Sequence, residues 1–414
     1  MKASTHTGMT AFTAIWLGQV VSLLGSAMTW FAFTIWAWQK TGEPSTLANI
    51  SFFAFLPTVL FTPIAGTFVD RWNRKLVMLL SDAATAFGTL AALLLLLTDN
   101  LQIWHVYIIG LAAGFFTAFQ YPAYAAAVST MLPKEQYARA EAMLGLAYTL
   151  SGILSPIFAA ALIGRIGITG IMTIDLLTFL AAFGTLVWAR IPQPHTTDIG
   201  QESRGSFWEE TAFGFRYIFG RRSLLELTGL FVAANFFLAI GATLMAPLVL
   251  SQTGNSASAL ASVQSTGAVG GVVGGALLMV WGGPKRRIHG VLLGGMGASL
   301  LGVAWLGWAN SLLLWSAGSF FFSFFEPFVE GGNLAIWQSK VEADVQGRVF
   351  SARHVLVRAP FMLGILASGS LAALGMSRVL VWAGLAGMGI FMTGYFFTRV
   401  HQVESLLPDQ AHGS

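Results

Sequence analysis

The stretch Gly66-Thr-Phe-Val-Asp70-Arg71-Trp-Asn-Arg74-Lys75-Leu76 decides the fold, because it is a short charged segment between two long apolar runs. The runs cover residues 46–69 and 75–98. Each is longer than the roughly 20 mostly apolar residues that a helix needs to cross a bilayer. The stretch is therefore a tight turn between two membrane helices, and helices joined by so short a turn run antiparallel.

The composition extends this interpretation to the whole chain of 414 residues. Hydrophobic residues make up 55% and charged residues 10%, whereas soluble proteins carry about 25% charged residues. The 46 glycines suit closely packed membrane helices. The net charge of +4 is modest and does not indicate nucleic-acid binding. The absence of cysteine excludes disulfides, thiolate metal sites and cysteine catalysis.

Outward from the turn, the hydropathy pattern predicts an all-α integral membrane protein with twelve transmembrane helices. The predicted spans are 10–38, 46–69, 75–98, 102–131, 139–164, 168–190, 224–250, 257–282, 288–310, 312–339, 347–374 and 376–399. They divide into an N-terminal six-helix bundle over 1–190 and a C-terminal bundle over 224–399. A cytoplasmic linker over 191–223 joins the bundles, and a cytoplasmic tail follows at 400–414.

Lysine and arginine predict the orientation, because they are enriched in cytoplasmic loops. With the N-terminus inside, eighteen of the 22 Lys and Arg residues fall inside, three fall outside, and Arg358 lies within a span. This asymmetry predicts a multi-pass protein of the cytoplasmic (inner) membrane with both termini in the cytoplasm.

The two halves of the chain resemble each other. Arg139 and Arg348 end similar loop segments and lie 209 residues apart, close to half of the chain. A duplicated six-helix unit is typical of transporters that work by alternating access. In the linker, aromatic and charged residues are interspersed through 206–222, which favours an amphipathic helix on the cytoplasmic leaflet. The alternative is an ordinary linker that packs on the protein.

The turn at 66–76, a glycine followed by Asp-Arg and further basic residues between spans two and three, resembles the signature of the major facilitator superfamily. Other segments resemble the macrolide-efflux and enterobactin-exporter branch of that family: Trp16–Gln19, Ser22–Ser26, Phe119–Ala123, Ser155–Pro156, Phe215–Arg222 and Gly347–Ser351. The resemblance implies two six-helix pseudo-repeats and export of a small amphipathic compound, often by drug–proton antiport.

Two positions depart from the family pattern. Ala113 stands where many proton-coupled members carry an arginine, and Ser155 replaces the glycine before a proline of span five.

Three ionisable residues lie near the middle of spans ten and eleven, where charges are costly and usually face a cavity or a partner. Glu326 and Glu330 are four residues apart, hence on one helix face, and Arg358 lies at a similar depth. Two close carboxylates favour binding of a proton, and a movement of Arg358 would release it. Direct recognition of a cationic substrate and a static Glu–Arg lock between the two spans are the alternatives.

A second group lies toward the cytoplasmic ends of the spans, where basic side chains bind lipid phosphates and helix C-termini. The residues expected to form a cytoplasmic gate are Gly66, Asp70, Arg71, Arg74, Lys75, Asp82, Arg139, Arg348 and Arg353. Asp175, inside span six, is expected to form a structural tie with Arg165.

Spans one, four, seven and ten line the substrate cavity in the superfamily, and here they carry aromatic and amide residues. Apolar pockets with a few polar groups suit drug-sized ligands, and aromatic faces can hold a cation. The predicted substrate-cavity residues are Gln19, Trp30, Gln120, Tyr121, Asn235, Phe325, Asn333 and Trp337.

The sequence therefore predicts a secondary active transporter that exports an amphipathic small molecule (a drug, macrolide or siderophore-like compound) by alternating access and ion-coupled antiport. A lipid or lysolipid transporter of the same fold is one alternative, and a non-transporting membrane receptor or scaffold is another.

An enzyme is not expected, and no catalytic, metal or cofactor site is predicted, because no such motif is recognised. The glycine-rich run 267–275 lies inside span eight and is assigned to helix packing. The expected partners are a small-molecule substrate, H+ as the coupling ion and membrane lipids. Nucleic acid is not expected, and the protein is expected to be a monomer.

Overall fold

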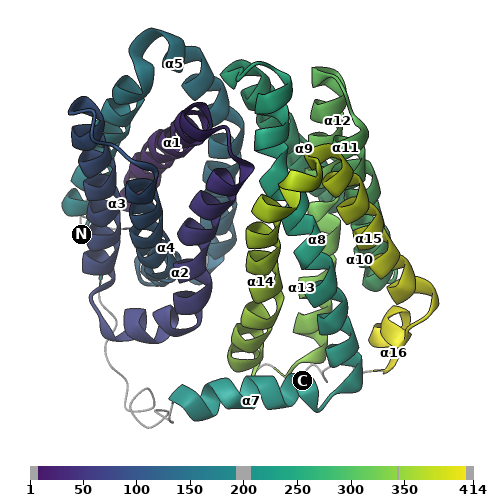
Figure 1. Ribbon diagram of the computed structural model, residues 1–414. Coiled ribbons are helices and arrows are strands. Elements are labelled where there is room, and N and C mark those ends of the chain that lie inside the picture. Colours follow the sequence, from purple (N-terminus) through teal and green to yellow (C-terminus); the bar gives the residue numbers. More distant parts are fainter. Residues whose placement is uncertain (1–7, 193–206, 343–344, 407–414) are drawn as a thin grey trace. The chain divides into compact units, whose positions relative to one another are not determined.

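The computed structural model describes residues 8–192, 207–342 and 345–406, and this part of the chain contains helices and no β-strand. The chain divides into two compact units. The first comprises residues 1–42 and 49–202, and the second comprises residues 43–48 and 203–414. Each unit is built from long helices (Figure 1).

The helices of the first unit are α1 (Gly8–Thr41), α2 (Pro44–Arg71, of which residues 44–48 group with the second unit), α3 (Arg74–Leu97), α4 (Ile103–Met131) and α5 (Tyr137–Trp188), with a 3₁₀ turn over Lys134–Gln136. The charged stretch forms the turn between α2 and α3, as the sequence predicts. Asn73 caps α3, since its side-chain oxygen accepts a hydrogen bond from the Leu76 backbone N–H at 3.2 Å.

The longest helix, α5, contains two membrane crossings. Its 52 residues would measure about 78 Å if the helix were straight, far more than the roughly 30 Å of a bilayer core. Gly167 interrupts the helix with φ 65° and ψ −177°, a conformation that glycine adopts without the steric cost of a Cβ. Spans five and six, predicted at 139–164 and 168–190, meet at this residue.

The second unit begins with a short helix that precedes the membrane spans. Its elements are α7 (Phe207–Phe219), α8 (Arg222–Gln252), α9 (Ala257–Trp281), α10 (Arg287–Gly297), the π-helix η2 (Ala298–Ala304), α11 (Trp305–Trp308), α12 (Leu312–Phe324), α13 (Glu326–Lys340), α14 (Gln346–Leu371), the 3₁₀ turn η3 (Ala372–Leu374), α15 (Met376–Phe396), the 3₁₀ turn η4 (Arg399–Gln402) and α16 (Val403–Leu406). Span nine is made of α10, η2 and α11, and span ten is made of α12 and α13.

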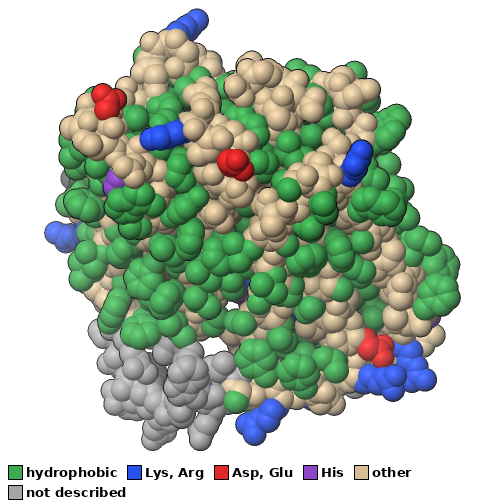
Figure 2. All heavy atoms as spheres, viewed as in Figure 1, with side chains coloured by type: hydrophobic (Ala, Val, Ile, Leu, Met, Phe, Trp, Pro, Cys, Tyr) green, Lys and Arg blue, Asp and Glu red, His purple; other side chains and the backbone are tan. Residues whose placement is uncertain are grey.

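Within the described ranges, eleven helices are long and apolar enough to cross a membrane. One of them is α5, which holds two crossings, so the count agrees with twelve spans. On the face that Figure 2 shows, hydrophobic side chains cover most of the helix surfaces, and charged side chains lie mainly toward the helix ends. The prediction of an all-α membrane protein with twelve transmembrane helices is confirmed.

Glycines on one face of α9 let this helix approach α12 closely. A Cβ added to Gly270 or Gly274 would lie 2.9 Å from the carbonyl carbon of Phe320 or Phe324, respectively. In contrast, a Cβ on Gly275 would meet no atom nearer than 3.9 Å. The glycine-rich run therefore packs one helix against another, since small residues allow close approach of membrane helices.

The linker helix α7 packs on α14. Arg348 lies over the Phe213 ring, 4.9 Å from its centre, and the Tyr217 hydroxyl donates a hydrogen bond to Glu342. Burial and this bond raise the pKa of Tyr217 to about 12, and the same bond lowers the pKa of Glu342. Arg221 covers the Tyr217 ring and lies 3.5 Å from the Glu342 carboxylate. The segment therefore forms a helix that packs on the protein, and its place on the cytoplasmic leaflet stays a prediction.

Candidate functional site

Polar side chains from three helices meet inside the first unit. Asp82 of α3 is 7% exposed. Its carboxylate accepts hydrogen bonds from Gln19 Nε2 of α1, at 2.7 Å, and from Gln120 Nε2 of α4. The structure therefore joins two predicted cavity residues to a residue that the sequence assigned to the gate. Among the described side chains, the hydrogen-bond partners of Asp82 are these two amides rather than basic residues.

A cavity of ≈ 90 Å³ lies beside Gln19 and Gln120. Its other polar and aromatic lining residues are Trp16, Thr117, Tyr121, Tyr124 and Tyr148. The Trp16 ring is held by a 2.7 Å hydrogen bond from its Nε1 to the Met143 carbonyl oxygen. The Tyr124 hydroxyl is buried and makes no hydrogen bond with any described residue. Because an unsatisfied buried hydroxyl is costly, this group is available to a molecule bound in the cavity.

The sequence identified only part of this lining. Gln19, Gln120 and Tyr121 were predicted as cavity residues, whereas Trp16 and Tyr148 were not. Tyr148 belongs to span five, a helix that the superfamily resemblance did not place at the cavity. Its phenol in an otherwise apolar span was the available signal, since buried tyrosine hydroxyls usually require a partner.

Charged side chains from α13 and α14 meet in the second unit. The guanidinium of Arg353 lies 3.9 Å from the Glu330 carboxylate and 5.5 Å from the centre of the Trp337 ring. Glu326 interacts electrostatically with both Glu330 and Arg358. The sequence linked both carboxylates to Arg358, whereas the structure gives the salt bridge of Glu330 to Arg353, five residues earlier on α14.

Span ten is interrupted beside this charged group. α12 ends at Phe324 and α13 begins at Glu326, with Pro327 directly after it. Proline is tolerated in a first helical turn, where no carbonyl partner is available for a backbone N–H. Glu326 lies in that turn, near the positive end of the helix dipole. The break is a bend at a proline rather than an unwound segment, because Phe325 keeps right-handed helical angles and backbone hydrogen bonds from Phe325 to Phe321 and from Val329 to Phe325 span it.

The remaining predicted cavity residues do not line the ≈ 90 Å³ cavity. Asn235 is 8% exposed and donates to a carbonyl oxygen one turn earlier in α8, at 2.8 Å. Asn333 and Trp337 are buried in the core of the second unit. Phe325 occupies the helix break, and Trp30 lines a separate small cavity beside Asp175.

Two basic residues of the predicted gate bind the backbone at helix ends. Arg74 Nη1 donates to the Ala126 carbonyl oxygen at 3.0 Å. Lys75 Nζ donates to the carbonyl oxygens of Val187 and Ala189, at 2.7 and 2.8 Å. These two carbonyls lie at the C-terminal end of α5, where a cation complements the helix dipole.

Apart from Asp82, the other predicted gate residues are exposed, belong to the charged group of the second unit, or lie outside the described part of the structure. Arg139 and Arg348 are exposed, and Arg353 belongs to the charged group described above. Gly66 and the side chains of Asp70 and Arg71 lie outside the described part of the structure. The role of the set as a gate stays a prediction.

Asp175 does not form the expected tie with Arg165. Its carboxylate accepts hydrogen bonds from Ser26 Oγ and Thr89 Oγ1, both at 2.9 Å, and Arg165 is exposed. The expectation was wrong because it considered only charged partners, whereas hydroxyl groups of α1 and α3 supply the donors.

Comparisons with known proteins agree with this architecture. Residues 15–365 match the family model described as Major Facilitator Superfamily. The chain is 28% identical over 405 residues to Macrolide efflux protein A of Streptococcus pyogenes, a match that covers 95% of this chain and 97% of that protein. It is 26% identical over 165 residues to the enterobactin exporter EntS of Shigella flexneri, which covers 38% of each chain. Among solved structures, a bacterial homologue of the iron transporter ferroportin in an inward-facing state matches with a TM-score of 0.67 at 14% identity, covering 92% of this chain and 98% of that chain.

Proposed function

Since the chain belongs to the major facilitator superfamily, we propose that it is a secondary active transporter that exports an amphipathic small molecule by alternating access. Similarity to a macrolide efflux protein over nearly the whole length of both chains supports the direction of transport. The observation that carries the substrate class is the cavity of the first unit, where Gln19 and Gln120, held by buried Asp82, lie beside aromatic rings.

The lining of this cavity suits a molecule with one apolar and one polar side. Trp16, Tyr121 and Tyr148 offer aromatic surface, and the Tyr124 hydroxyl offers an unused hydrogen-bonding group. The volume of ≈ 90 Å³ is well below the roughly 300–1,000 Å³ typical of drug-sized sites. We therefore assign the cavity to one part of the substrate, namely a ring or side group that enters between α1, α4 and α5.

We assign coupling to H+ to the charged group of the second unit. The Glu330–Arg353 distance of 3.9 Å is long for a salt bridge, and the Glu330 side chain is 47% exposed. A proton can therefore reach this carboxylate and cancel its charge. Arg353 keeps the face of the Trp337 ring when that happens, which offsets part of the lost interaction. Protonation of Glu330 would then free α13 from α14 at this point and link proton uptake to substrate release.

Uptake of a labelled macrolide into inverted membrane vesicles tests the proposal. We expect a proton gradient to drive uptake, and we expect a sodium gradient of equal size alone to drive none. Glu330→Gln should abolish the dependence on the proton gradient. Glu135→Gln is the matched control, because Glu135 is exposed in the 3₁₀ turn before α5.

Three outcomes would contradict parts of the proposal. Uptake that ignores both gradients would remove ion-coupled antiport. An unchanged proton dependence in Glu330→Gln would remove the assigned coupling site. Transfer of a labelled lysolipid between leaflets, without macrolide uptake, would replace drug export by lipid transport.

We further propose that the protein acts as a monomer in the cytoplasmic membrane with both termini in the cytoplasm. The chain has no cysteine, so single cysteines can be introduced without background labelling. A cysteine at Lys2 should resist an impermeant thiol reagent in intact cells, whereas a cysteine at Asn255, in the α8–α9 loop, should react. Equal labelling of both positions would contradict the topology.

A further inference from the structure

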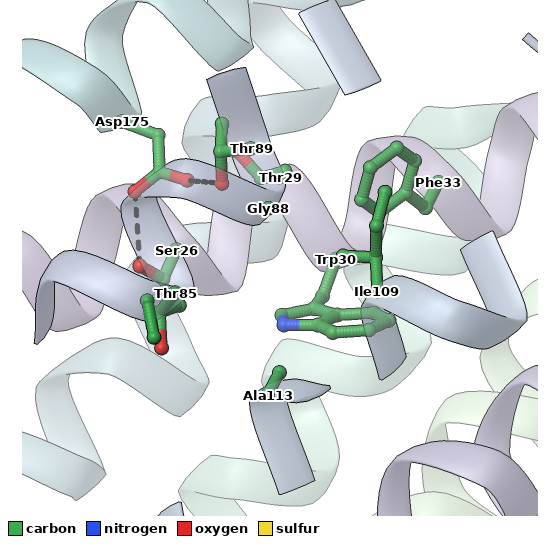
Figure 3. A pocket seen from close by; sticks show the side chains of 11 residues that line it. Ser26, Thr29, Trp30, Phe33, Thr85, Gly88, Thr89, Ile109, Ala113 and Asp175 are labelled. Carbon is green, nitrogen blue, oxygen red and sulfur yellow. Dashed lines mark hydrogen bonds between the residues drawn. The ribbon is translucent and has the colours of Figure 1, made fainter. Parts of the chain in front are cut away.

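A second buried carboxylate lies in the first unit, away from the proposed substrate cavity. Asp175 of α5 is 3% exposed, and Ser26 of α1 and Thr89 of α3 each donate a hydrogen bond to it at 2.9 Å. Figure 3 shows these side chains converging on one point. Gly25 permits this approach, because a Cβ there would lie 3.0 Å from the Asp175 Cα. Three helices therefore build a preformed polar site in an otherwise apolar region.

A third hydroxyl at this site faces the same carboxylate without a hydrogen bond of ordinary geometry. Thr29 is 2% exposed, and its Oγ1 makes no hydrogen bond of ordinary geometry. It nevertheless lies close enough to the Asp175 carboxylate to interact with it. Thr29 and Asp175 line a cavity of ≈ 10 Å³ together with Ser26 and Thr89 (Figure 3). That volume corresponds to about one water-sized sphere, so the site has room for one small ligand.

The charge at the site has no compensation from side chains. Within the described ranges, no basic residue pairs with Asp175, and its hydrogen-bond donors are neutral hydroxyls. An isolated charge at membrane depth is costly, so such carboxylates face a cation or a charged partner. A hydroxyl that donates its proton to the carboxylate keeps lone pairs for a cation in the cavity.

We propose that Asp175, Ser26, Thr29 and Thr89 form a binding site for one Na+ ion. Carboxylate and hydroxyl oxygens are the ligands that hard cations prefer. The single negative charge matches a monovalent ion, whereas a divalent ion would leave a net positive charge in the membrane. In the described part of the chain, no three His, Cys, Asp or Glu residues gather, which disfavours a transition metal.

The site is distinct from the proposed substrate cavity but lies on the same two helices. Ser26 follows Gln19 by seven residues on α1, and Thr89 follows Asp82 by seven residues on α3. Seven residues correspond to two helical turns, or about 10 Å. The Asp82 and Asp175 carboxylates, each hydrogen-bonded to a side chain of α1, therefore lie about two turns apart along α1.

Direct binding and thermal unfolding of the purified protein in detergent test the proposal. We expect saturable binding of ²²Na+, and we expect NaCl to raise the unfolding temperature above that in choline chloride of equal ionic strength. Asp175→Asn, which keeps the shape of the side chain, should abolish both effects. Thr29→Val should weaken Na+ binding roughly tenfold (about 1.4 kcal/mol) and leave the protein folded, since its hydroxyl makes no hydrogen bond of ordinary geometry. Thr34→Val is the matched control on α1, because the Thr34 hydroxyl bonds only to the Trp30 carbonyl oxygen of its own helix, at 3.0 Å.

Absence of Na+ binding to the unaltered protein would overturn the proposal, as would unchanged binding to Asp175→Asn. Stabilisation that follows pH and is indifferent to Na+ would also overturn it, because Asp175 would then carry a proton. None of these readouts needs a substrate. Failure here therefore leaves the proposed export untouched, and failure of macrolide uptake leaves the Na+ site untouched.

Discussion

Replacement of Gly274 by alanine is expected to destabilise the second unit. The new Cβ would lie 2.9 Å from the carbonyl carbon of Phe324 and would overlap its oxygen, whereas ordinary contacts begin at 3.4 Å. α9 and α12 would have to separate by at least about 0.5 Å. Phe324 is the last residue of α12, directly before the break that leads to Glu326. The separation would therefore also displace the charged group.

The magnitude follows from two opposing effects. Overpacking of a well-packed interior costs about 1–3 kcal/mol, and alanine is favoured over glycine in a helix interior by roughly 0.5–1 kcal/mol. Gly275→Ala shows the second effect alone, because the nearest atom to its Cβ is Pro327 Cγ at 3.9 Å. The helix-propensity gain is common to both variants, so their free energies of unfolding should differ by the overpacking cost, about 1–3 kcal/mol.

Denaturant titration of both variants in the same detergent measures this difference, and macrolide uptake into vesicles reports the displaced charged group. Gly275→Ala should be at least as stable as the unaltered protein and should transport normally. Equal stability of Gly274→Ala and Gly275→Ala would refute the close packing of α9 on α12.

Three further predictions concern the polar contacts of both units. Asp82→Asn should slow macrolide uptake, because a carboxamide has one acceptor oxygen for the two amides that donate to Asp82; Asp99→Asn, in the exposed α3–α4 turn, should transport normally. Lys75→Met should lower the free energy of unfolding by about 1 kcal/mol, through loss of its hydrogen bonds to the end of α5; an unchanged denaturation midpoint would contradict this. The Tyr217–Glu342 contact should stabilise the fold best between about pH 5 and pH 10. The contribution of Tyr217 to folding stability is complete below its ordinary pKa of 10.0 and is lost as the pH rises through about 12. The contribution of Glu342 is present above its ordinary pKa of 4.5 and is lost as the pH falls through its lowered pKa. Tyr217→Phe should remove the alkaline loss from the pH profile of thermal unfolding, and an identical profile would contradict the contact.

The span boundaries were predictable because the bilayer imposes a length and a polarity on each helix. The predicted start of span three at 75 and its end at 98 differ from α3 by one residue at each end. Hydropathy carries no information about backbone conformation inside a span. The break at Phe325 and the π-helix in span nine were therefore not predicted from the sequence. Pro327 next to Glu326 was the available signal for the break.

The candidate site was less predictable because hydropathy does not specify how each helix is rotated about its axis. Arg353 and Arg358 differ by five residues, or about 140° around α14. The rotation of α14 about its axis decides which of them meets Glu330. Asp175 illustrates a second reason: its partners are hydroxyl groups, which occur throughout the chain and carry no charge pattern that a sequence search can follow.

The seven-residue spacing on α1 and α3 has a consequence for how the first unit can move. Gln19 and Ser26 belong to one continuous helix, as do Asp82 and Thr89. A slide or rotation of α1 against α3 as rigid bodies therefore changes the Gln19–Asp82 distance and the Ser26–Thr89 distance in the same event. An ion that holds Ser26 and Thr89 around Asp175 would in this way restrain the amide of Gln19 about 10 Å away. Na+ bound at Asp175 would then limit how freely the substrate cavity beside Gln19 can change shape, without any contact between the ion and the substrate.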